Sequence, residues 1–124
     1  MEKYSEYMGE GYYMKVRKKL TVDAELLPDS MIDADINIGA MKELVAAGIE
    51  SMKSVGKSVD DEKKYGILQD MALNYLCGVL CLALKSRTSV PPFNVEKYKR
   101  NWDKKSEKFM RYGNSQMMGL IRMG

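Results

Sequence analysis

The feature that most limits how this chain can fold is a long apolar segment in its second half. Between Asp60 and Arg87 the sequence opens with three acidic residues, continues through a run rich in leucine, alanine and cysteine, and closes on Lys85 and Arg87. Acidic residues favour the start of a helix and basic residues favour its end, because each offsets the partial charge of the helix dipole there. Apolar side chains cover more than half of the helix circumference, so we expect the central helix of a helical domain.

The length of this apolar segment favours a buried helix over a membrane span. Its longest apolar run, Met71 to Leu84, has 14 residues and includes Asn74, whereas roughly 20 apolar residues are needed to cross a bilayer. Residues 1–20 are rich in tyrosine and charge and lack the apolar stretch of a secretory signal. We therefore expect a protein without membrane association that is made in the cytoplasm.

The two cysteines of the chain lie in the same run. Cys77 and Cys81 are one helical turn apart and share a helix face, an arrangement that does not easily give the geometry of a disulfide. Two cysteines are also too few for a four-thiolate metal site within one chain. Both are expected to be free core thiols, as in a reducing compartment.

A second helix is expected before the central one. It follows Pro28, begins near Asp29 or Ser30, either of which can cap it, and stops near Gly48. The serine- and glycine-containing stretch from Glu50 to Val59 predicts a surface connection. Apolar residues at helical spacing predict the buried stripe of this helix: Ile32, Ile36, Ala40, Leu44 and Ala47.

A third helix is expected after the central one. Pro91 and Pro92 stop the central helix, Asn94 is a good cap for the next one, and Gly113 ends it. Lys105 or Ser106 occupies a turn in which the apolar pattern is interrupted. The remaining positions of the stripe are apolar or aromatic: Val95, Tyr98, Trp102, Phe109 and Tyr112.

The two ends of the chain are also rich in apolar side chains. In residues 1–20, Gly9 and Gly11 interrupt a helical stripe, so both a stable helix and an arm that orders only against a partner remain open. The stripe consists of Tyr4, Tyr7, Met8, Tyr12, Val16 and Leu20. Residues 114–124 carry a single charge, on Arg122, and are too apolar for a solvated disordered end. We expect a methionine-bearing tail that docks into a partner through Met117, Met118, Leu120 and Ile121.

These patterns predict an all-α fold, a small bundle of three main helices with an N-terminal arm and an extended C-terminal tail. The arm covers residues 1–20, the helical domain residues 21–113, and the partner-docking tail residues 114–124.

Several classes of chemistry are excluded or disfavoured by composition. The chain has no histidine, which removes the commonest general base and zinc ligand. Its clustered acidic residues, such as Asp33, Asp35 and Asp60, lie at predicted helix starts, where capping explains them. A single G-x-G at Gly9 and Gly11 follows no strand and lacks a third glycine. We expect no catalytic residue, no metal and no cofactor, and therefore no enzyme.

Charge is distributed unevenly along the chain. Residues 21–64 carry a net charge of −5 and residues 85–112 a net charge of +6. The basic segment could be a solvated helix face, could contact nucleic acid, or could face the acidic part of a neighbouring copy in a head-to-tail contact. The residues of this subunit-interface or DNA-facing basic face are Lys97, Arg100, Lys104, Lys105, Lys108 and Arg111.

The order of these parts resembles a known family. The run LPDSMIDADINIGAMKELVAAGI, within Val22 to Ile49, looks like the first helical region of the head-to-tail connector proteins of tailed phages, also called adaptor or head-completion proteins. The run DDEKKYGILQDMALNYLCGVLCLALKSR is similar to their long central helix. The runs YKRNWDKKSEKFMRYG and NSQMMGLIRMG fit their third helix and mobile tail. The tyrosine-rich residues 1–13 have no counterpart in that pattern.

The resemblance implies a structural virion protein at the head-tail junction. Such proteins form a ring, commonly of twelve copies, beneath the portal, extend the DNA channel and provide the attachment surface for the tail or stopper protein. Genomic DNA would pass through the ring without sequence-specific contact, the C-terminal tail would insert into the portal, and the connection 50–59 would face the next component. The alternative is a small helical nucleic-acid-binding or regulatory protein that uses the basic third helix.

Overall fold

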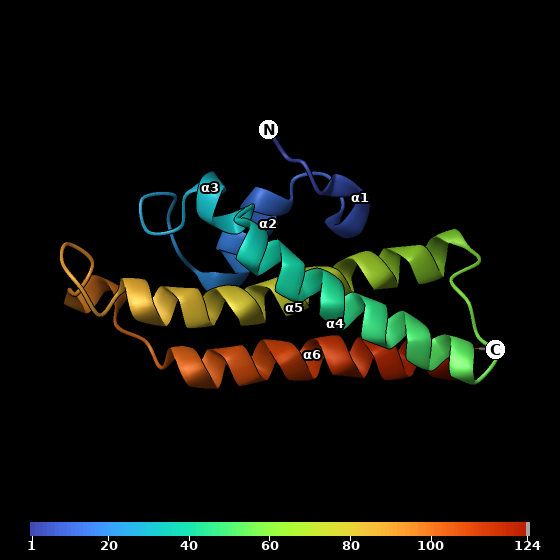
Figure 1. Ribbon diagram of the computed structural model, residues 1–124. Coiled ribbons are helices and arrows are strands. Elements are labelled where there is room, and N and C mark those ends of the chain that lie inside the picture. The colour runs from blue at the N-terminus through green and yellow to red at the C-terminus, as the bar shows by residue number, and fades with distance from the viewer. Residues whose placement is uncertain (124) are drawn as a thin grey trace.

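The computed structural model describes residues 1–123, and within them the fold is all-helical, as the sequence predicts (Figure 1). Its long helices are α4 (Asp35–Ser54), α5 (Glu62–Arg87) and α6 (Trp102–Arg122). Shorter elements are α1 (Ser5–Met8), α2 (Tyr12–Leu20), α3 (Asp29–Ile32) and the single 3-10 turn η1 (Glu96–Tyr98). Figure 1 shows α5 and α6 side by side, α4 crossing them, and α1 to α3 on the side of α5 away from α6.

Helix α5 has the central position that its composition predicts. Asp61 caps it by accepting a hydrogen bond from the backbone N–H of Lys64 at 2.8 Å. Every residue from Met71 to Gly78 is buried, because α4, α6 and the N-terminal helices all pack on this helix. Cys77 and Cys81 are free thiols in that core.

Within residues 1–123, α5 is the one helix that is long and apolar enough to cross a membrane. Of its most apolar 18-residue window, 61% is buried by the rest of the protein. Length and composition alone do not separate a membrane span from a core helix, and here neighbouring helices cover most of that window.

Helix α6 differs from the prediction at both ends. Its cap is Asn101, which accepts a hydrogen bond from the backbone N–H of Lys104 at 3.0 Å, whereas Asn94 lies before the separate turn η1. The helix does not stop at Gly113 but continues to Arg122. Ser106, in the turn that lacks an apolar residue, donates to the carbonyl of Gly78 at 2.8 Å and is buried.

The continuation through Gly113 follows from close packing. A methyl group at Gly113 would lie 2.5 Å from a ring carbon of Tyr75, and one at Gly78 would lie 2.8 Å from the terminal carbon of Met110. Each glycine therefore lets a large side chain of the other helix approach the backbone. At position 113 glycine marks a helix contact and not a helix end, so residues 114–122 form about two and a half further turns of α6 in place of an extended tail.

Helix α4 also differs from its predicted boundaries and face. The predicted helix is interrupted after Ile32, so that α3 and α4 are separate helices. Helix α4 then runs past Gly48 to Ser54, which shortens the expected connection. Ile36, predicted to be buried, is 82% exposed. The buried face is rotated from the predicted stripe and consists of Asn37, Ile38, Met41, Val45, Gly48 and Met52. Gly48 faces Met117 of α6, where an added methyl group would lie 3.2 Å from the sulfur.

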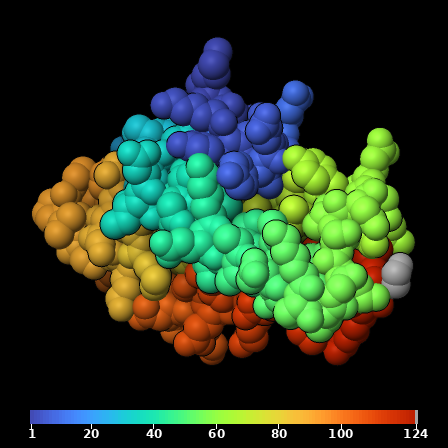
Figure 2. Space-filling model, turned by 45° about the vertical axis from the view of Figure 1, so that its right-hand side comes forward, coloured from blue at the N-terminus to red at the C-terminus, as the bar shows by residue number. Residues whose placement is uncertain are grey.

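Residues 1–20 pack on the protein itself. Positive φ angles at Gly9 and Gly11 separate α1 from α2 and let both short helices lie on α5. Four residues of the predicted stripe are buried: Met8, Tyr12, Val16 and Leu20. We call residues 1–33 the N-terminal layer. Figure 2 shows α4 lying across the molecule between this layer and α6.

Candidate interaction surfaces

The predicted basic face divides into two groups in the structure. Lys97 pairs with Asp23 at 3.3 Å, and Arg100 donates to the backbone carbonyl of Thr21 at 3.0 Å. These two side chains tie η1 and the start of α6 to the N-terminal layer. The other group lies along α6, and within residues 1–123 its members form no ion pair: Lys104, Lys105, Lys108 and Arg111.

The outer side of α6 is the basic surface of the molecule that faces away from α5. Lys104 and Arg111 are exposed, and Lys108 and Lys105 are half-buried. The ammonium of Lys108 lies 5.1 Å from the centre of the Phe109 ring. Without carboxylate partners in the described part of the chain, these cations are available to an anionic partner.

The four residues predicted to dock into a partner do not share one surface. Leu120 is fully buried, and Met117 packs against Gly48 of α4. Met118 is 42% exposed on the outer side of α6, and Ile121 is half-buried. The regular helix places successive residues on different sides, so of the four only Met118 is exposed on the outer face.

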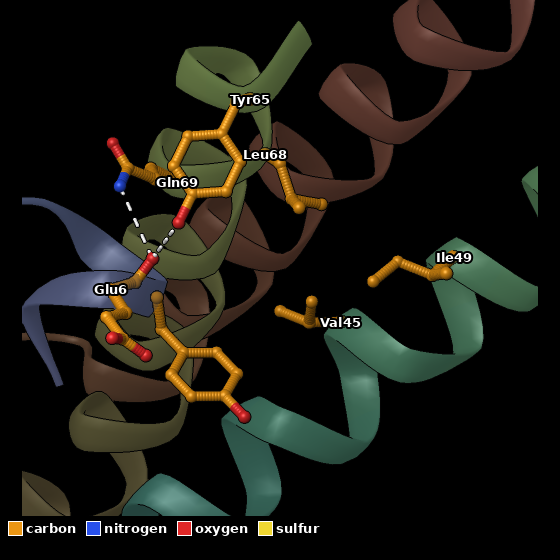
Figure 3. Close-up of a pocket in the computed structure, with 7 residues that line it drawn as sticks. Glu6, Val45, Ile49, Tyr65, Leu68 and Gln69 are labelled. Atoms are coloured by element: carbon orange, nitrogen blue, oxygen red, sulfur yellow. Dashed lines mark hydrogen bonds between the residues drawn. The ribbon is translucent and has the colours of Figure 1, made fainter. Parts of the chain in front are cut away.

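A hollow that the sequence did not predict lies between α4 and the first half of α5 (Figure 3). It has a volume of about 220 Å³. Figure 3 shows Tyr65, Leu68 and Gln69 of α5 opposite Val45 and Ile49 of α4. Helix α1 closes one end of it through Glu6 and Tyr7.

Two hydrogen bonds hold α1 at the end of this hollow. The hydroxyl of Tyr65 donates to the backbone carbonyl of Glu6 at 2.7 Å, and the amide of Gln69 donates to the same oxygen at 3.3 Å (Figure 3). Both bonds leave the carboxylate of Glu6 free to face solvent. They also orient the Tyr65 ring, which is 45% exposed.

A second hollow of about 290 Å³ continues beyond Tyr65 towards the end of α4. The two hollows share Ile49, Tyr65 and Leu68, and the second adds Met52 and Val59 as further apolar lining. We call the continuous depression the Tyr65 groove. Acidic residues lie beside it at the start of α5, and two lysines lie at its α4 end: Asp60, Asp61, Glu62, Lys53 and Lys57.

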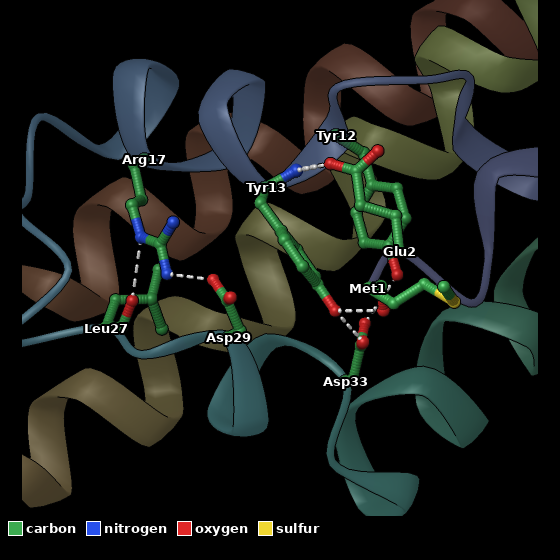
Figure 4. A network of polar contacts seen from close by, with 8 residues as sticks. All are labelled: Met1, Glu2, Tyr12, Tyr13, Arg17, Leu27, Asp29 and Asp33. Atoms are coloured by element: carbon green, nitrogen blue, oxygen red, sulfur yellow. Dashed lines mark hydrogen bonds and ion pairs between the residues drawn. The ribbon is translucent and has the colours of Figure 1, made fainter.

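A polar network holds the N-terminal layer together (Figure 4). The hydroxyl of Tyr12 donates to the carboxylate of Asp33 at 2.6 Å, and the hydroxyl of Tyr13 donates to its other oxygen. The carboxylate of Glu2 accepts hydrogen bonds from the backbone N–H groups of Gly11 and Tyr13 at 2.7 and 2.9 Å. Burial and the Asp33 carboxylate raise the pKa of Tyr13 to about 12, and the same two causes raise the pKa of Tyr12 further.

Two further acidic residues have structural partners. Asp29 accepts a hydrogen bond from the guanidinium of Arg17 at 2.6 Å (Figure 4), and Asp60 pairs with Lys64 at 2.9 Å. No group of three or more histidine, cysteine, aspartate or glutamate side chains suited to a metal ion occurs in residues 1–123. Burial raises the pKa of Cys81 to about 11, which keeps this thiol protonated and unreactive at neutral pH.

Comparison with protein-family models, with curated proteins and with solved structures finds no match for this chain.

Proposed function

We propose that this protein is a structural, non-enzymatic subunit that assembles head to tail into a ring, as do the phage connectors that its sequence resembles. The observation that carries the proposal is the basic outer side of α6, whose cations form no ion pair within residues 1–123 although the exposed Glu107 belongs to the same helix, on a chain that carries most of its acidic residues elsewhere. Residues 85–112 carry a net charge of +6, residues 21–64 carry −5, and Lys104, Lys108 and Arg111 have no carboxylate partner within residues 1–123.

Opposite charges on different surfaces of one subunit favour a heterologous contact. The basic surface of one copy then meets the acidic surface of the next, and the assembly closes into a ring when the rotation between copies allows it. Complementary charge also sets the register and speeds the encounter. The closely packed α5–α6 pair is suited to such an assembly because a rigid subunit repeats the same angle at each contact.

In this proposal the ring, of about twelve copies as in the connectors, lies at the head-tail junction of a virion. It binds the portal on one side and a tail or stopper protein on the other, and genomic DNA passes through it without sequence-specific contact. Of the four predicted docking residues, Met118 is exposed on a single subunit and Ile121 is half-buried. Docking of Leu120 and Met117 as well would require the last turns of α6 to leave the core.

The mass of the purified protein in solution tests the proposal. We would measure it by light scattering behind a sizing column, alone and mixed with a candidate portal ring. A ring-sized species, formed alone or with the portal, is expected. A monomer that stays monomeric at high concentration and ignores the portal would contradict the proposal.

A second candidate function, nucleic-acid binding, is favoured by the same line of cations on α6. It predicts that the affinity for duplex DNA falls steeply with salt, because each neutralised phosphate releases counterions. Reversing the charge of Lys104, Lys108 and Arg111 would then reduce the affinity much more than reversing the exposed cations Lys18 and Lys63 elsewhere. Equal losses in both variants would contradict a dedicated DNA surface on α6.

A further inference from the structure

We infer that the Tyr65 groove of one copy receives the outer side of α6 of a second copy, with Met118 as the side chain that enters it. This inference rests on the proposed function and deepens it, since it names the two surfaces that would meet in the ring. The groove is apolar, with acidic residues along the edge formed by α1 and the start of α5 and with Lys53 and Lys57 at its α4 end, and the exposed part of α6 is an apolar side chain between cations.

The groove offers apolar surface that the chain itself leaves uncovered. Its two hollows, of about 220 and 290 Å³, meet at Ile49, Tyr65 and Leu68. Each is large enough for a few side chains and too short for a whole helix to enter. A helix lying over the groove would therefore fill it with single projecting side chains, and the flexible side chain of methionine adapts well to such irregular hollows.

The outer side of α6 presents such a side chain. Met118 is 42% exposed, and it lies seven residues after Arg111 and four before Arg122, so all three share one side of the helix. A shallow surface depression is lined by these residues together with Asn114 and Ser115. Met118 thus lies between two arginines on the same side of the helix.

The charges beside the two surfaces are complementary. Glu6 lines the groove and Glu62 lies beside it; both are exposed, and neither carboxylate forms an ion pair within residues 1–123. Arg111 and Arg122 are likewise exposed and form no ion pair there. When Met118 enters the groove, the arginines on either side of it can reach the acidic edge.

The contact requires two copies. The inner side of α6 packs on α5 of the same chain, so its outer side faces away from the groove, which lies between α5 and α4. The two surfaces of one chain cannot meet without unfolding the α5–α6 pair. Between copies they form a heterologous contact that leaves one groove and one helix side free for the next copy, as a ring requires.

Charge-reversal variants test this contact. The groove variant is Glu6→Lys with Glu62→Lys, and the helix variant is Arg111→Glu with Arg122→Glu. All four side chains are exposed, so both variants should keep the helical circular dichroism of the native protein. The matched control is Glu25→Lys with Glu43→Lys, which reverses two exposed carboxylates outside the groove.

Assembly is measured by light scattering under the conditions in which the native protein forms a ring. The groove variant alone and the helix variant alone should each need at least about tenfold more protein to assemble, because like charges would face each other. An equal mixture of the two should assemble as the native protein does, because lysines then face glutamates at one contact and arginines face glutamates at the next. The control should assemble normally.

The outcomes separate this inference from the proposed function. If the native protein forms rings and the two variants do as well, the contact is wrong while the proposed function stands. If each variant fails and their mixture also fails, the groove and the helix do not face each other, and the contact is again overturned. A groove variant that assembles but no longer binds a tail protein would assign the groove to that protein instead. If the native protein forms no ring, with or without a portal, the proposed function fails and this inference fails with it.

Discussion

The α5–α6 pair and the N-terminal layer are held in place by different forces. Between α5 and α6 the closest contacts are steric, since Gly113 lies against the ring of Tyr75 and Gly78 against Met110, and a few hydrogen bonds such as that from Ser106 to Gly78 accompany them. The N-terminal layer packs an apolar face on α5, but the contacts among its own segments are largely polar and converge on the carboxylate of Asp33 (Figure 4). The stability of the α5–α6 pair therefore depends on side-chain volume, and the stability of the N-terminal layer depends on the protonation and pairing of a few groups.

This difference predicts how each region responds to change. A close-packed interface tolerates neither an added methyl group nor a lost one, because interiors have few voids. A hydrogen-bonded layer tolerates changes of volume at its surface but is sensitive to the loss of an acceptor or to pH. The variants below test one region against the other.

The largest effect is expected for Leu120→Ala near the end of α6. Leu120 is fully buried, so its truncation should lower the free energy of unfolding by about 2–5 kcal/mol. Met118→Ala, on the exposed side of the same helix, should change it by less than about 0.5 kcal/mol. Denaturant melts measure both. Equal, small effects would mean that residues 114–122 are not part of the core and would restore the extended-tail prediction.

A smaller loss is expected for Gly113→Ala. Alanine favours a helix, but its methyl group would lie 2.5 Å from the ring of Tyr75, so overpacking should lower the stability by about 1–3 kcal/mol. Gly119→Ala lies in the same helix with no atom within 4 Å of the added group. That variant should raise the stability by about 0.5–1 kcal/mol. A stabilising Gly113→Ala would refute the close approach of the two helices.

In the N-terminal layer, Asp33→Ala should remove the common acceptor of Tyr12 and Tyr13. The buried hydroxyl of Tyr12 would lose its acceptor, which should lower the stability by about 1–2 kcal/mol. The loss should be local, with faster hydrogen exchange in residues 1–20 and little change in α5 and α6. Asp35→Ala, an exposed acidic residue two positions later, is the control. Uniformly faster exchange over the whole chain would contradict the separation of the two regions.

The smallest effect concerns alkaline pH. The pKa of Tyr13 is raised from about 10 to about 12 in the folded protein, so the protonated hydroxyl stabilises the fold. That stability is fully present below pH 10, where the unfolded chain is protonated too, and is lost as pH rises from about 10 to 12. Between pH 10 and pH 11 the loss from this group should reach at most about 1 kcal/mol.

Tyr13→Phe should reduce that dependence on pH, because the variant has no proton to release at this position. Thermal melts at pH 9 and pH 11 measure the difference between the variant and the native protein. Tyr75 must be considered as well, since burial raises its pKa in the α5–α6 pair. An unchanged dependence in Tyr13→Phe would assign the alkaline sensitivity to other tyrosines whose pKa is raised, Tyr12 and Tyr75 among them.

The sequence predicts the features of this fold that depend on helix periodicity. The all-helical class and the central position of α5 follow from composition and spacing alone. The burial of Tyr98, Trp102 and Phe109 does too, whereas Val95 and Tyr112 of the same predicted stripe are exposed, and the choice of Ser106 over Lys105 for the interrupted turn is not predicted.

The sequence predicts poorly where one pattern has two physical meanings. A glycine near the end of an apolar run is typical of a helix stop, but Gly48 and Gly113 serve close helix contacts that depend on residues far away in the chain. In α4 the predicted stripe and the buried face are offset by one residue, a rotation of about 100° around the helix, and only the position of α5 and α6 decides that Ile38 is buried and Ile36 exposed.

The same limit applies to the candidate surfaces. The spacing of Lys104, Lys108 and Arg111 predicts that these residues share one side of a helix. The ion pair between Lys97 and Asp23 joins residues 74 positions apart, and no local sequence pattern predicts it. The Tyr65 groove needs three separate helices to exist. Its one local hint is Tyr65 itself, an aromatic residue near the polar start of an otherwise apolar helix.

The number of residues between contacting positions differs between the two regions, and this difference affects the order of folding. Helices α5 and α6 are joined by the connection 88–101, whereas the hydroxyl of Tyr65 reaches a carbonyl 59 residues earlier and Tyr98 reaches Asp23 across 75 residues. Contacts between near neighbours in sequence form sooner. Although residues 1–33 are synthesised first, they have no surface to pack on until α5 exists. They therefore join the folded protein last, and substitutions in them should change the rate of unfolding more than the rate of folding.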